Sequence, residues 1–198
     1  MRLAINQPYF FPYRGYFDLI NQADLFVAFD TAQYVRHSWM NRNKITTGYI
    51  TVPLQKHSQK TPLNEIKIST PYKDDLINKL MVYNKSPQFV TVTNFIRSIL
   101  HGENLSELNI NTLRAVCEYL GITTPIVAYS NMSLKLGPIN EPGDWAVEIS
   151  KALGATEYLN LPGGKSFLDP KRFNKLTFIE TKPSLSIIDD LYEGLVCW

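Results

Sequence analysis

The stretch RLAINQPYFFPYRGYFDLINQADLFVAFD, residues 2–30, decides the fold. It begins with the short apolar run RLAI and ends with the apolar run LFVAFD. Between them, Gly15 opens a helical pattern of aromatic and aliphatic residues. A strand, a loop, a helix and a second strand form a βαβ unit, whose two strands are parallel. The stretch therefore predicts adjacent parallel strands at residues 3–6 and 25–29.

The segment after this unit has a weaker pattern. Residues 31–48 predict a loop with a short helix. The alternating run YITVPL (49–54) predicts a strand that Pro53 closes or places at an edge, and NEIKIS (64–69) predicts a strand that pairs with it. A proline follows a capping residue at Thr70-Pro71 and at Ser86-Pro87, which predicts helices near 71–84 and 87–100. A third helix is expected over 105–120, before Gly121.

The second half alternates between helices and strands. CEYLGITTPIVAYS (117–130) and SKALGATEYLNLP (150–162) each predict a helix followed by a strand. A helix-like stretch at 166–174, the strand-like run LTFIE and the run SLSIIDDLYEG complete the alternation, and NMSLKLGPINEPGD (131–144) is the best candidate for a mobile loop. The pattern predicts an α/β fold with a mostly parallel, Rossmann-like sheet and helices on both faces. The helical block at about 71–120 is an insertion or a layer on one face, and one domain over 1–198 is expected.

The composition is that of an ordinary soluble globular protein. The 198 residues are 44% hydrophobic and 19% charged, with a formal net charge of +2. The start of the chain lacks the apolar core of a signal peptide, and no apolar segment is long enough to span a bilayer, so we expect a cytoplasmic protein without membrane insertion. Two cysteines, Cys117 and Cys197, fit a reducing compartment, and their spacing predicts no zinc site.

The charges are distributed unevenly. No acidic residue occurs between Asp30 and Glu65. A concentration of positive charge on loops at a sheet edge favours an anionic ligand over a solvated basic surface without a partner. Arg42 lies between two asparagines and close to Trp39, a combination that suits a phosphate with an attached ring. The basic residues of this window are Arg36, His37, Arg42, Lys44, Lys56, His57 and Lys60.

Ligands of doubly wound sheets bind at the carboxyl ends of the strands. Three segments are expected there: the loop after RLAI, the segment DTAQYVRHSWMNRNKI (30–45) and the segment NLPGGKSF (160–167). We therefore expect Asp30, Trp39, Arg42 and Asn160 to share one pocket with the loop from Tyr9 to Gly15. Backbone amides around Gly163, Gly164 and Lys165 could hold an anion, but this glycine pair alone favours an ordinary turn.

The first of these segments is rich in aromatic residues. Two prolines stiffen it, and Gly15 allows a tight turn into the helix. Tyr9, Tyr13 and Tyr16 provide flat surfaces and hydroxyl groups for a base or a sugar ring. The layout PYRGY (12–16) resembles the HxGH loop of adenylyl- and cytidylyl-transferring enzymes, with Tyr13 and Tyr16 at the histidine positions. Tyrosine hydroxyls can donate to a phosphate but bring no charge.

Few residues are candidates for proton transfer. His37, beside Arg36 and near Trp39, is the plausible general base among the three histidines. His57 lies in a polar segment and is assigned to solvent, and His101 is assigned to a helix C-terminus. Asp30 ends a strand at the carboxyl edge, where it could orient an amine, act as a base or bind magnesium.

Several of these motifs occur together in one known family. INQPYFFPYRGYFDLI, FDTAQYVRHSWMNRNKI, YITVPLQK, LGATEYLNLPGGKSFLD and LSIIDDLYEG, in that order, resemble the WbqC-like proteins over nearly the whole chain. That family is associated with O-antigen and other surface-polysaccharide gene clusters. The segment FIETKPS before the last helix is shorter than in most members, which would remove a ligand contact or lid. By this resemblance the family signature falls on Gln7, Pro8, Tyr9, Pro12, Gly15, Asp30, Gln33, Trp39, Asn41, Arg42, Asn43, Lys56, Tyr158, Asn160, Gly163 and Gly164.

The resemblance implies a transferase or ligase that acylates the amine of a nucleotide-linked amino sugar with glycine or a similar amino acid. ATP with magnesium could activate the acid, or a charged tRNA could deliver it; other nucleic acid partners are not expected. The alternative is a non-catalytic module that binds nucleotides or sugar nucleotides for other enzymes. Catalytic candidates are Asp30, His37 and Arg42, and binding candidates are Gln7, Tyr9, Tyr13, Gly15, Tyr16, Gln33, Trp39, Asn41, Asn43, Lys56, Asn160, Gly163, Gly164 and Lys165.

Overall fold

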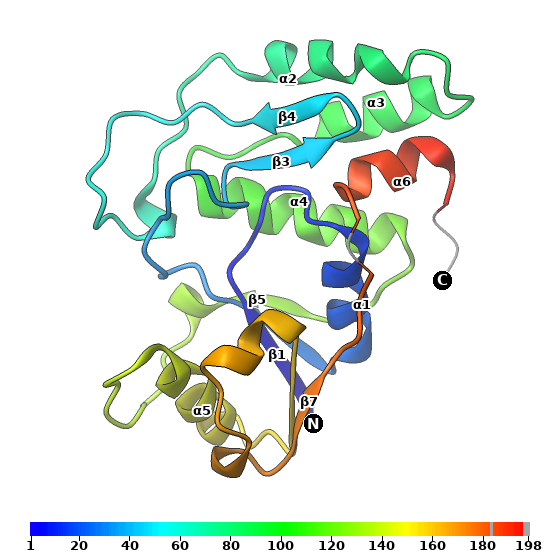
Figure 1. Ribbon diagram of the computed structural model, residues 1–198. Coiled ribbons are helices and arrows are strands. Elements are labelled where there is room, and N and C mark those ends of the chain that lie inside the picture. The colour runs from blue at the N-terminus through cyan, green and yellow to red at the C-terminus, as the bar shows by residue number, and fades with distance from the viewer. Residues whose placement is uncertain (183, 196–198) are drawn as a thin grey trace.

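The computed structural model describes residues 1–182 and 184–195 of the chain (Figure 1). Its centre is a five-stranded parallel sheet, and a two-stranded antiparallel hairpin stands apart from it. Cys197 lies outside the described residues. The sheet contains β1 (Arg2–Asn6), β2 (Leu25–Ala28), β5 (Ile126–Ala128), β6 (Glu157–Asn160) and β7 (Leu176–Phe178), and the hairpin contains β3 (Arg42–Ile45) and β4 (Gly48–Thr51).

The strand order of the sheet is β5-β2-β1-β6-β7. β1 pairs in parallel with β2, with Leu3 opposite Leu25, so the predicted βαβ unit is confirmed. Counted along the chain within this sheet, the order reads 3-2-1-4-5, which is the Rossmann arrangement. The order reverses between β1 and β6, and ligands of such sheets bind in the crevice at the carboxyl ends of these strands.

Helices cover both faces of the sheet, as predicted. Side chains alternate along each strand, so Ala4 and Phe26 lie on one face while Leu3 and Val27 lie on the other. The first face packs in one hydrophobic cluster with α1 (Arg14–Gln22) and α4 (Leu105–Tyr119). The second face packs against α5 (Pro142–Ala152).

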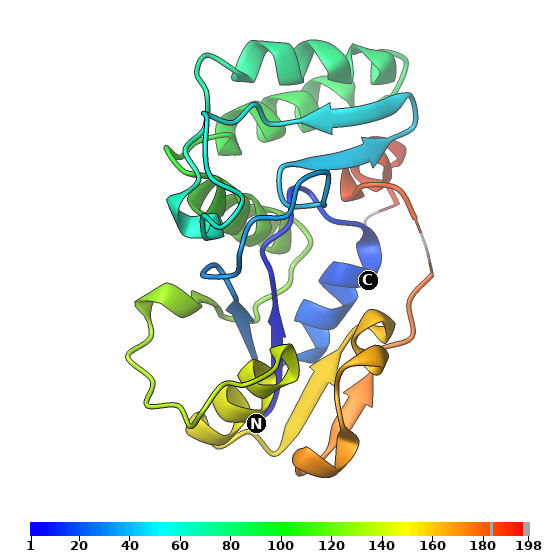
Figure 2. The ribbon, with the colours of Figure 1, turned by 60° about the vertical axis from the view of Figure 1, so that its left-hand side comes forward.

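The predicted helical block lies beyond the carboxyl end of the sheet. In both views of the ribbon, α2 and α3 lie beside the hairpin and α4 lies between this layer and the sheet (Figures 1 and 2). α2 (Lys73–Lys79) and α3 (Phe89–Ile99) each begin two residues after the proline that was expected to start them. α4 begins after Asn104, whose side chain accepts from the Glu107 amide, and the chain leaves it at Gly121 with a φ of +74°.

Three local predictions are wrong. Residues 31–48 contain β3 instead of a short helix; RNKI is too polar to predict a strand, and its pairing with β4 makes it one. NEIKIS contains a 3₁₀ turn instead of a strand, although its expected pairing with the preceding run is present as an antiparallel bridge between Leu54 and Ile68. The stretch 166–174 contains the last residue of one 3₁₀ turn and a complete second one instead of a helix, because glycines and prolines in and around it disfavour helix.

The last part of the chain returns to the helical block. Residues 131–141, the first part of the predicted mobile loop, have no regular structure beyond a 3₁₀ turn that ends at Asn131. After β7 the chain runs to α6 (Ile187–Glu193), which packs near α3. The segment between them therefore spans from the sheet to the helical block. Within the described ranges, no helix combines the length and the apolar character needed to cross a bilayer.

Candidate functional site

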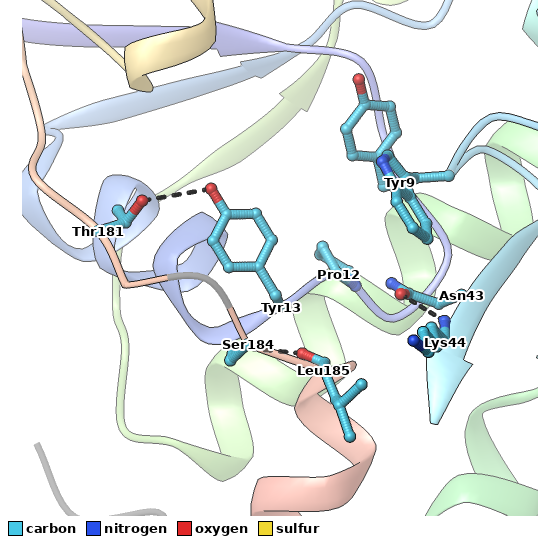
Figure 3. Close-up of a pocket in the computed structure, with 9 residues that line it drawn as sticks. Tyr9, Pro12, Tyr13, Asn43, Lys44, Thr181, Ser184 and Leu185 are labelled. Carbon is cyan, nitrogen blue, oxygen red and sulfur yellow. Dashed lines mark hydrogen bonds between the residues drawn. The ribbon is translucent and has the colours of Figure 1, made fainter. Parts of the chain in front are cut away.

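Three segments that are distant in sequence enclose a pocket at the carboxyl end of the sheet, here called pocket 1 (Figure 3). They are the loop after β1, strand β3 and the segment between β7 and α6. The pocket has a volume of about 290 Å³. Its lining residues are Tyr9, Pro12, Tyr13, Trp39, Asn43, Lys44, Thr181, Ser184 and Leu185.

Two buried asparagines hold the loop after β1 in place. Asn43 Nδ2 donates to the carbonyls of Phe10 and Phe11, at 3.1 and 2.7 Å. Asn109 Nδ2, on α4, donates to the carbonyls of Pro8 and Met40, at 2.8 and 2.7 Å. Buried carbonyls need hydrogen-bond donors, and no strand of the described residues pairs with this irregular loop. Asn43 therefore stabilises the conformation of the aromatic loop through two hydrogen bonds and also lines pocket 1.

The C-terminal segment closes against the start of α1. Ser186 Oγ donates to the Phe11 carbonyl at 2.7 Å, and the Ser186 amide donates to the Lys44 carbonyl at 2.9 Å. A Cβ atom at Gly15 would lie 2.5 Å from Thr181 Cβ, so only glycine allows this approach. The segment FIETKPS, whose shortness was expected to remove a ligand contact or lid, thus supplies Thr181 and Ser184 to pocket 1.

The tyrosines of pocket 1 offer ring faces and hydroxyl groups. Burial, with a smaller contribution from Tyr13, raises the pKa of Tyr9, so its hydroxyl stays protonated and donates to Gln7 Oε1 at 3.3 Å. The Tyr13 ring is turned toward Thr181, and the two hydroxyl oxygens lie 3.4 Å apart (Figure 3). Lys44 adds a cation on β3. Flat rings beside hydroxyls and a cation suit a ring-bearing anionic ligand.

A second pocket, here called pocket 2, lies at the open end of the hairpin. Its volume is about 520 Å³. Arg36, Arg42 and Lys56 line it, and none of the described residues that line it is acidic. Such a wall favours an anion. The full lining is Tyr34, Arg36, His37, Asn41, Arg42, Thr51, Val52, Pro53, Leu54, Gln55, Lys56 and His57.

Arg42 occupies a fixed position in the wall of pocket 2. Its Nη2 donates to the His37 carbonyl at 2.7 Å, and its guanidinium carbon lies 4.5 Å from the ring centroid of Tyr49. Arg42 Nε is buried and has no hydrogen-bond partner among the described residues. The Tyr49 ring in turn stacks on Trp39 of pocket 1, with centroids 6.4 Å apart. These planar groups connect the two pockets.

The residues expected to share one pocket are divided in the structure. Trp39 lines pocket 1, Arg42 lines pocket 2, and Asp30 and Asn160 line neither. Asp30 is 3% exposed and accepts hydrogen bonds from the amide and hydroxyl of Ser130, at 2.9 and 2.5 Å. These hydrogen bonds join the segment after β2 to the segment after β5, so Asp30 has a structural role. A role for Asp30 as a base stays a prediction.

The glycine-rich segment has a local structural role as well. Asn160 Oδ1 accepts from the Leu161 amide at 2.7 Å, and a Cβ at Gly164 would lie 2.6 Å from Asn160 Nδ2. Gly163 is exposed, and Lys165 lies near Glu180 and the Phe178 ring. None of these four residues lines pocket 1 or pocket 2.

Four other binding candidates, Gln7, Gly15, Tyr16 and Gln33, also lie outside the two pockets. Tyr16 is fully buried and donates its hydroxyl to the Gln7 carbonyl at 2.6 Å, and burial raises its pKa strongly. Its ring therefore belongs to the core. Gln33 Nε2 donates to the Gln59 carbonyl at 2.8 Å on the surface.

Six binding candidates and two catalytic candidates do line one of the two pockets, as expected of ligand contacts: Tyr9, Tyr13, Trp39 and Asn43 in pocket 1, and Asn41, Lys56, His37 and Arg42 in pocket 2. Asn41 and Lys56 lie in pocket 2 with His37, which is exposed and has a φ of +59°. Asn41 is buried; its side chain accepts from the Tyr34 hydroxyl and donates to the Val52 carbonyl. Tyr9 and Tyr13 lie in pocket 1. Contact with a ligand stays a prediction for each.

Some residues of the two pockets were not candidates from the sequence. Thr181, Ser184 and Leu185 reach pocket 1 only through the return of the chain toward the hairpin. His57 was assigned to solvent because its neighbours are polar, but it lines pocket 2. Tyr34 lines the same pocket, and burial raises its pKa, although Arg36 and Arg42 act in the opposite direction.

The described residues do not fit a magnesium ion held by protein ligands at these pockets. Neither pocket has a carboxylate among its described lining residues, and both Asp30 oxygens accept hydrogen bonds from serines. No group of three or more His, Cys, Asp or Glu side chains in residues 1–182 and 184–195 is arranged to hold a metal ion.

Comparison with known proteins gives one curated relative and one family. The chain is 30% identical over 218 aligned positions to the uncharacterized protein Rv1507c of Mycobacterium tuberculosis, covering 96% of this chain and 93% of that protein. No solved structure matches the chain. The model of the WbqC-like protein family matches residues 7–191, a range that contains both pockets. The chain therefore belongs to the WbqC-like protein family.

Proposed function

We propose that the protein binds a nucleotide-linked amino sugar across the two pockets and acylates its amine with glycine or a similar small amino acid. The aromatic walls of pocket 1 hold a ring, and the cations of pocket 2 and Lys44 neutralise the phosphates. The acyl donor is an activated form of the amino acid. The setting would be the assembly of a bacterial surface polysaccharide, as the family resemblance implies.

One observation carries this proposal: strand β3 supplies a cation to each of two adjoining pockets of different character. Arg42 lines the basic pocket and Lys44 lines the aromatic one. Two residues along a strand are about 7 Å apart. A ligand that joins a ring to a phosphate group through a few bonds can contact both cations at once.

The position of pocket 1 in the fold supports the same ligand class. The loop after β1 and the segment after β7 both line it, so it lies on the side of the sheet where the strand order reverses. Rossmann-type sheets bind nucleotides at this point. The aromatic loop replaces a glycine-rich phosphate loop, which explains why stacking and side-chain cations supply the binding groups.

A second candidate function is a binding module without catalysis. The position of Asp30 favours it, because two serines occupy the carboxylate that was the best candidate for a base. In this alternative the chain presents a sugar nucleotide to another enzyme. Both functions require the same ligand, so binding and turnover must be measured separately.

Binding is tested by thermal shift against ATP, CTP, UDP-glucose, UDP-glucosamine, a dTDP-sugar and glycine. A ligand that binds only the folded state raises the melting temperature. We expect UDP-glucosamine or the dTDP-sugar to give the largest increase. No increase with any nucleotide-linked sugar would reject both functions.

Turnover is tested by incubating the best sugar nucleotide with glycine, ATP and magnesium, or with glycyl-tRNA, and recording the mass of the sugar nucleotide. The transferase proposal predicts a product heavier by one glycyl group. Binding without any mass change from either donor would favour the module.

A further inference from the structure

The histidine that was assigned to solvent has the geometry of a ligand-binding group. His57 Nδ1 lies 2.7 Å from the Gln55 carbonyl oxygen. A carbonyl oxygen can only accept a hydrogen bond, so Nδ1 carries the proton. In the neutral ring, Nε2 is then left with a lone pair and can only accept. This nitrogen is buried and has no partner among the described residues.

A chain of contacts fixes the ring of His57 in the wall of pocket 2. The Tyr34 ring meets it edge-on, with centroids 4.9 Å apart at 90°. The Tyr34 hydroxyl donates to Asn41 Oδ1 at 3.0 Å, and Asn41 Nδ2 donates to the Val52 carbonyl at 3.0 Å. This series of contacts begins at the Gln55 carbonyl and ends at the Val52 carbonyl. Backbone groups, and not solvent, therefore set the orientation of His57 Nε2.

Two residues that line pocket 2 thus each carry a buried polar atom without a partner among the described residues, one a donor and one an acceptor. Arg42 Nε is the donor and His57 Nε2 is the acceptor. A buried polar atom without a partner is unfavourable, and such atoms often mark a place where a ligand or a water completes the hydrogen bonding. Arginines and a lysine alone would suit any anion. An added acceptor suits an anion that also carries a hydrogen on an oxygen or nitrogen.

We infer that pocket 2 selects an oxyanion that carries its own hydrogen-bond donor, with Arg42 binding the anionic oxygen and His57 Nε2 accepting from the donor. This inference deepens the proposed function, since the donor of a nucleotide-linked amino sugar is an amine or hydroxyl near its phosphates. Inorganic phosphate has the same chemistry in its smallest form, because it keeps a P–OH group at neutral pH. Sulfate has a similar shape and no such hydrogen.

The first test is the tautomer of His57 in the intact chain. Nitrogen-15 NMR of the histidine rings, at a mildly alkaline pH where free imidazole is neutral, distinguishes a protonated from an unprotonated Nε2. We expect Nδ1 to carry the proton and the Nε2 signal to shift when inorganic phosphate is added. A proton on Nε2 would overturn the inference, since this atom could not then accept.

The second test compares inorganic phosphate with sulfate by NMR titration at constant ionic strength. One additional hydrogen bond predicts a preference for phosphate of about tenfold. His57→Asn keeps a donor for the Gln55 carbonyl and removes Nε2, so it should abolish the preference. Arg42→Ala should weaken the binding of both anions. The control His101→Asn, at an exposed histidine outside both pockets, should keep the preference.

Equal affinities for phosphate and sulfate, or an unchanged preference in folded His57→Asn, would refute the inference. Neither result depends on a sugar nucleotide. The inference can therefore fail while UDP-glucosamine binds, and it can hold while every sugar nucleotide fails.

Discussion

Replacing Arg42 by alanine should weaken the binding of the best sugar nucleotide much more than removing another cation of the same segment. Arg42 Nε is buried and has no hydrogen-bond partner in the part of the chain that the structure describes, and the guanidinium plane is held between the His37 carbonyl and the Tyr49 ring. A planar fork held in this way can grip phosphate oxygens with little further loss of freedom. The loss of a hydrogen bond to a charged group is worth about 1.5–3 kcal/mol, which is roughly a ten- to hundredfold loss of affinity.

Titration calorimetry of matched variants measures this effect. Lys60→Ala removes the same charge from an exposed position outside both pockets, and water screening limits its effect to about fivefold at most. Arg42→Lys keeps the charge and loses the fork, so it should fall between the two. Raising the salt concentration should weaken binding to the native chain more than binding to Arg42→Ala.

Folding must be checked in each variant, because Arg42 also holds the loop at His37. That carbonyl belongs to an exposed residue, so its loss should lower stability by only about 0.5–1.5 kcal/mol. If Arg42→Ala melts as a folded protein and binds as tightly as the native chain, the anion-binding interpretation of pocket 2 is refuted. Arg42 would then be a structural residue of the hairpin.

Three further predictions concern stability. Backbone hydrogen bonds from Asn140 and Glu141, and then Arg172, lower the pKa of Asp144 from its ordinary 3.8 to about 2. The ionised Asp144 should therefore add fully to the free energy of unfolding above pH 3.8, and this contribution should disappear as the pH falls through 2. Urea denaturation of Asp144→Asn over the same pH range should not show this loss of stability. Gly15→Ala places a Cβ atom 2.5 Å from Thr181 Cβ and should lower the free energy of unfolding by about 1–3 kcal/mol. The control Gly163→Ala places its Cβ more than 4 Å from any described neighbour and should change this free energy by less than about 0.5 kcal/mol. Equal urea midpoints for the two variants would contradict the close approach of Thr181 to Gly15. Asn109→Ala leaves two buried carbonyls unpaired and should cost about 1–3 kcal/mol for each in urea denaturation; a loss below about 1 kcal/mol would show that other donors replace the side chain.

The sheet could be predicted from the sequence because its signals are local. The run from Arg2 to Asp30 contains two apolar strands, a glycine turn and an amphipathic helix, and each acts over a few residues. Burial on both faces makes the strands continuously apolar, and helix-to-strand joints recur at Gly121 and Gly154. Local patterns also predicted the helical block. They predicted a basic site in the acid-free window 31–64, and this window supplies the residues that line pocket 2.

What the sequence could not determine depends on contacts between distant segments. Strand β3 exists because RNKI pairs with β4, and the aromatic loop keeps its shape because Asn43 and Asn109 satisfy its carbonyls. The division of the site into two pockets follows from these contacts. Local patterns carry no information about such pairings, whose partners are as far apart as Asn109 and Pro8.

The roles of Asp30 and His57 show the same limit. By sequence alone, Asp30 is an acid at the end of a strand, free to act on a ligand, and His57 is a polar residue in a polar loop. In the folded chain two serines donate hydrogen bonds to Asp30, and His57, which lines pocket 2, has an Nε2 atom that finds no partner among residues 1–182 and 184–195. The sequence by itself determined the α/β sheet and the basic character of the site. Only the tertiary structure decided which polar groups are satisfied by the protein and which are left for a ligand, because hydrogen-bond partners are chosen by distance in space.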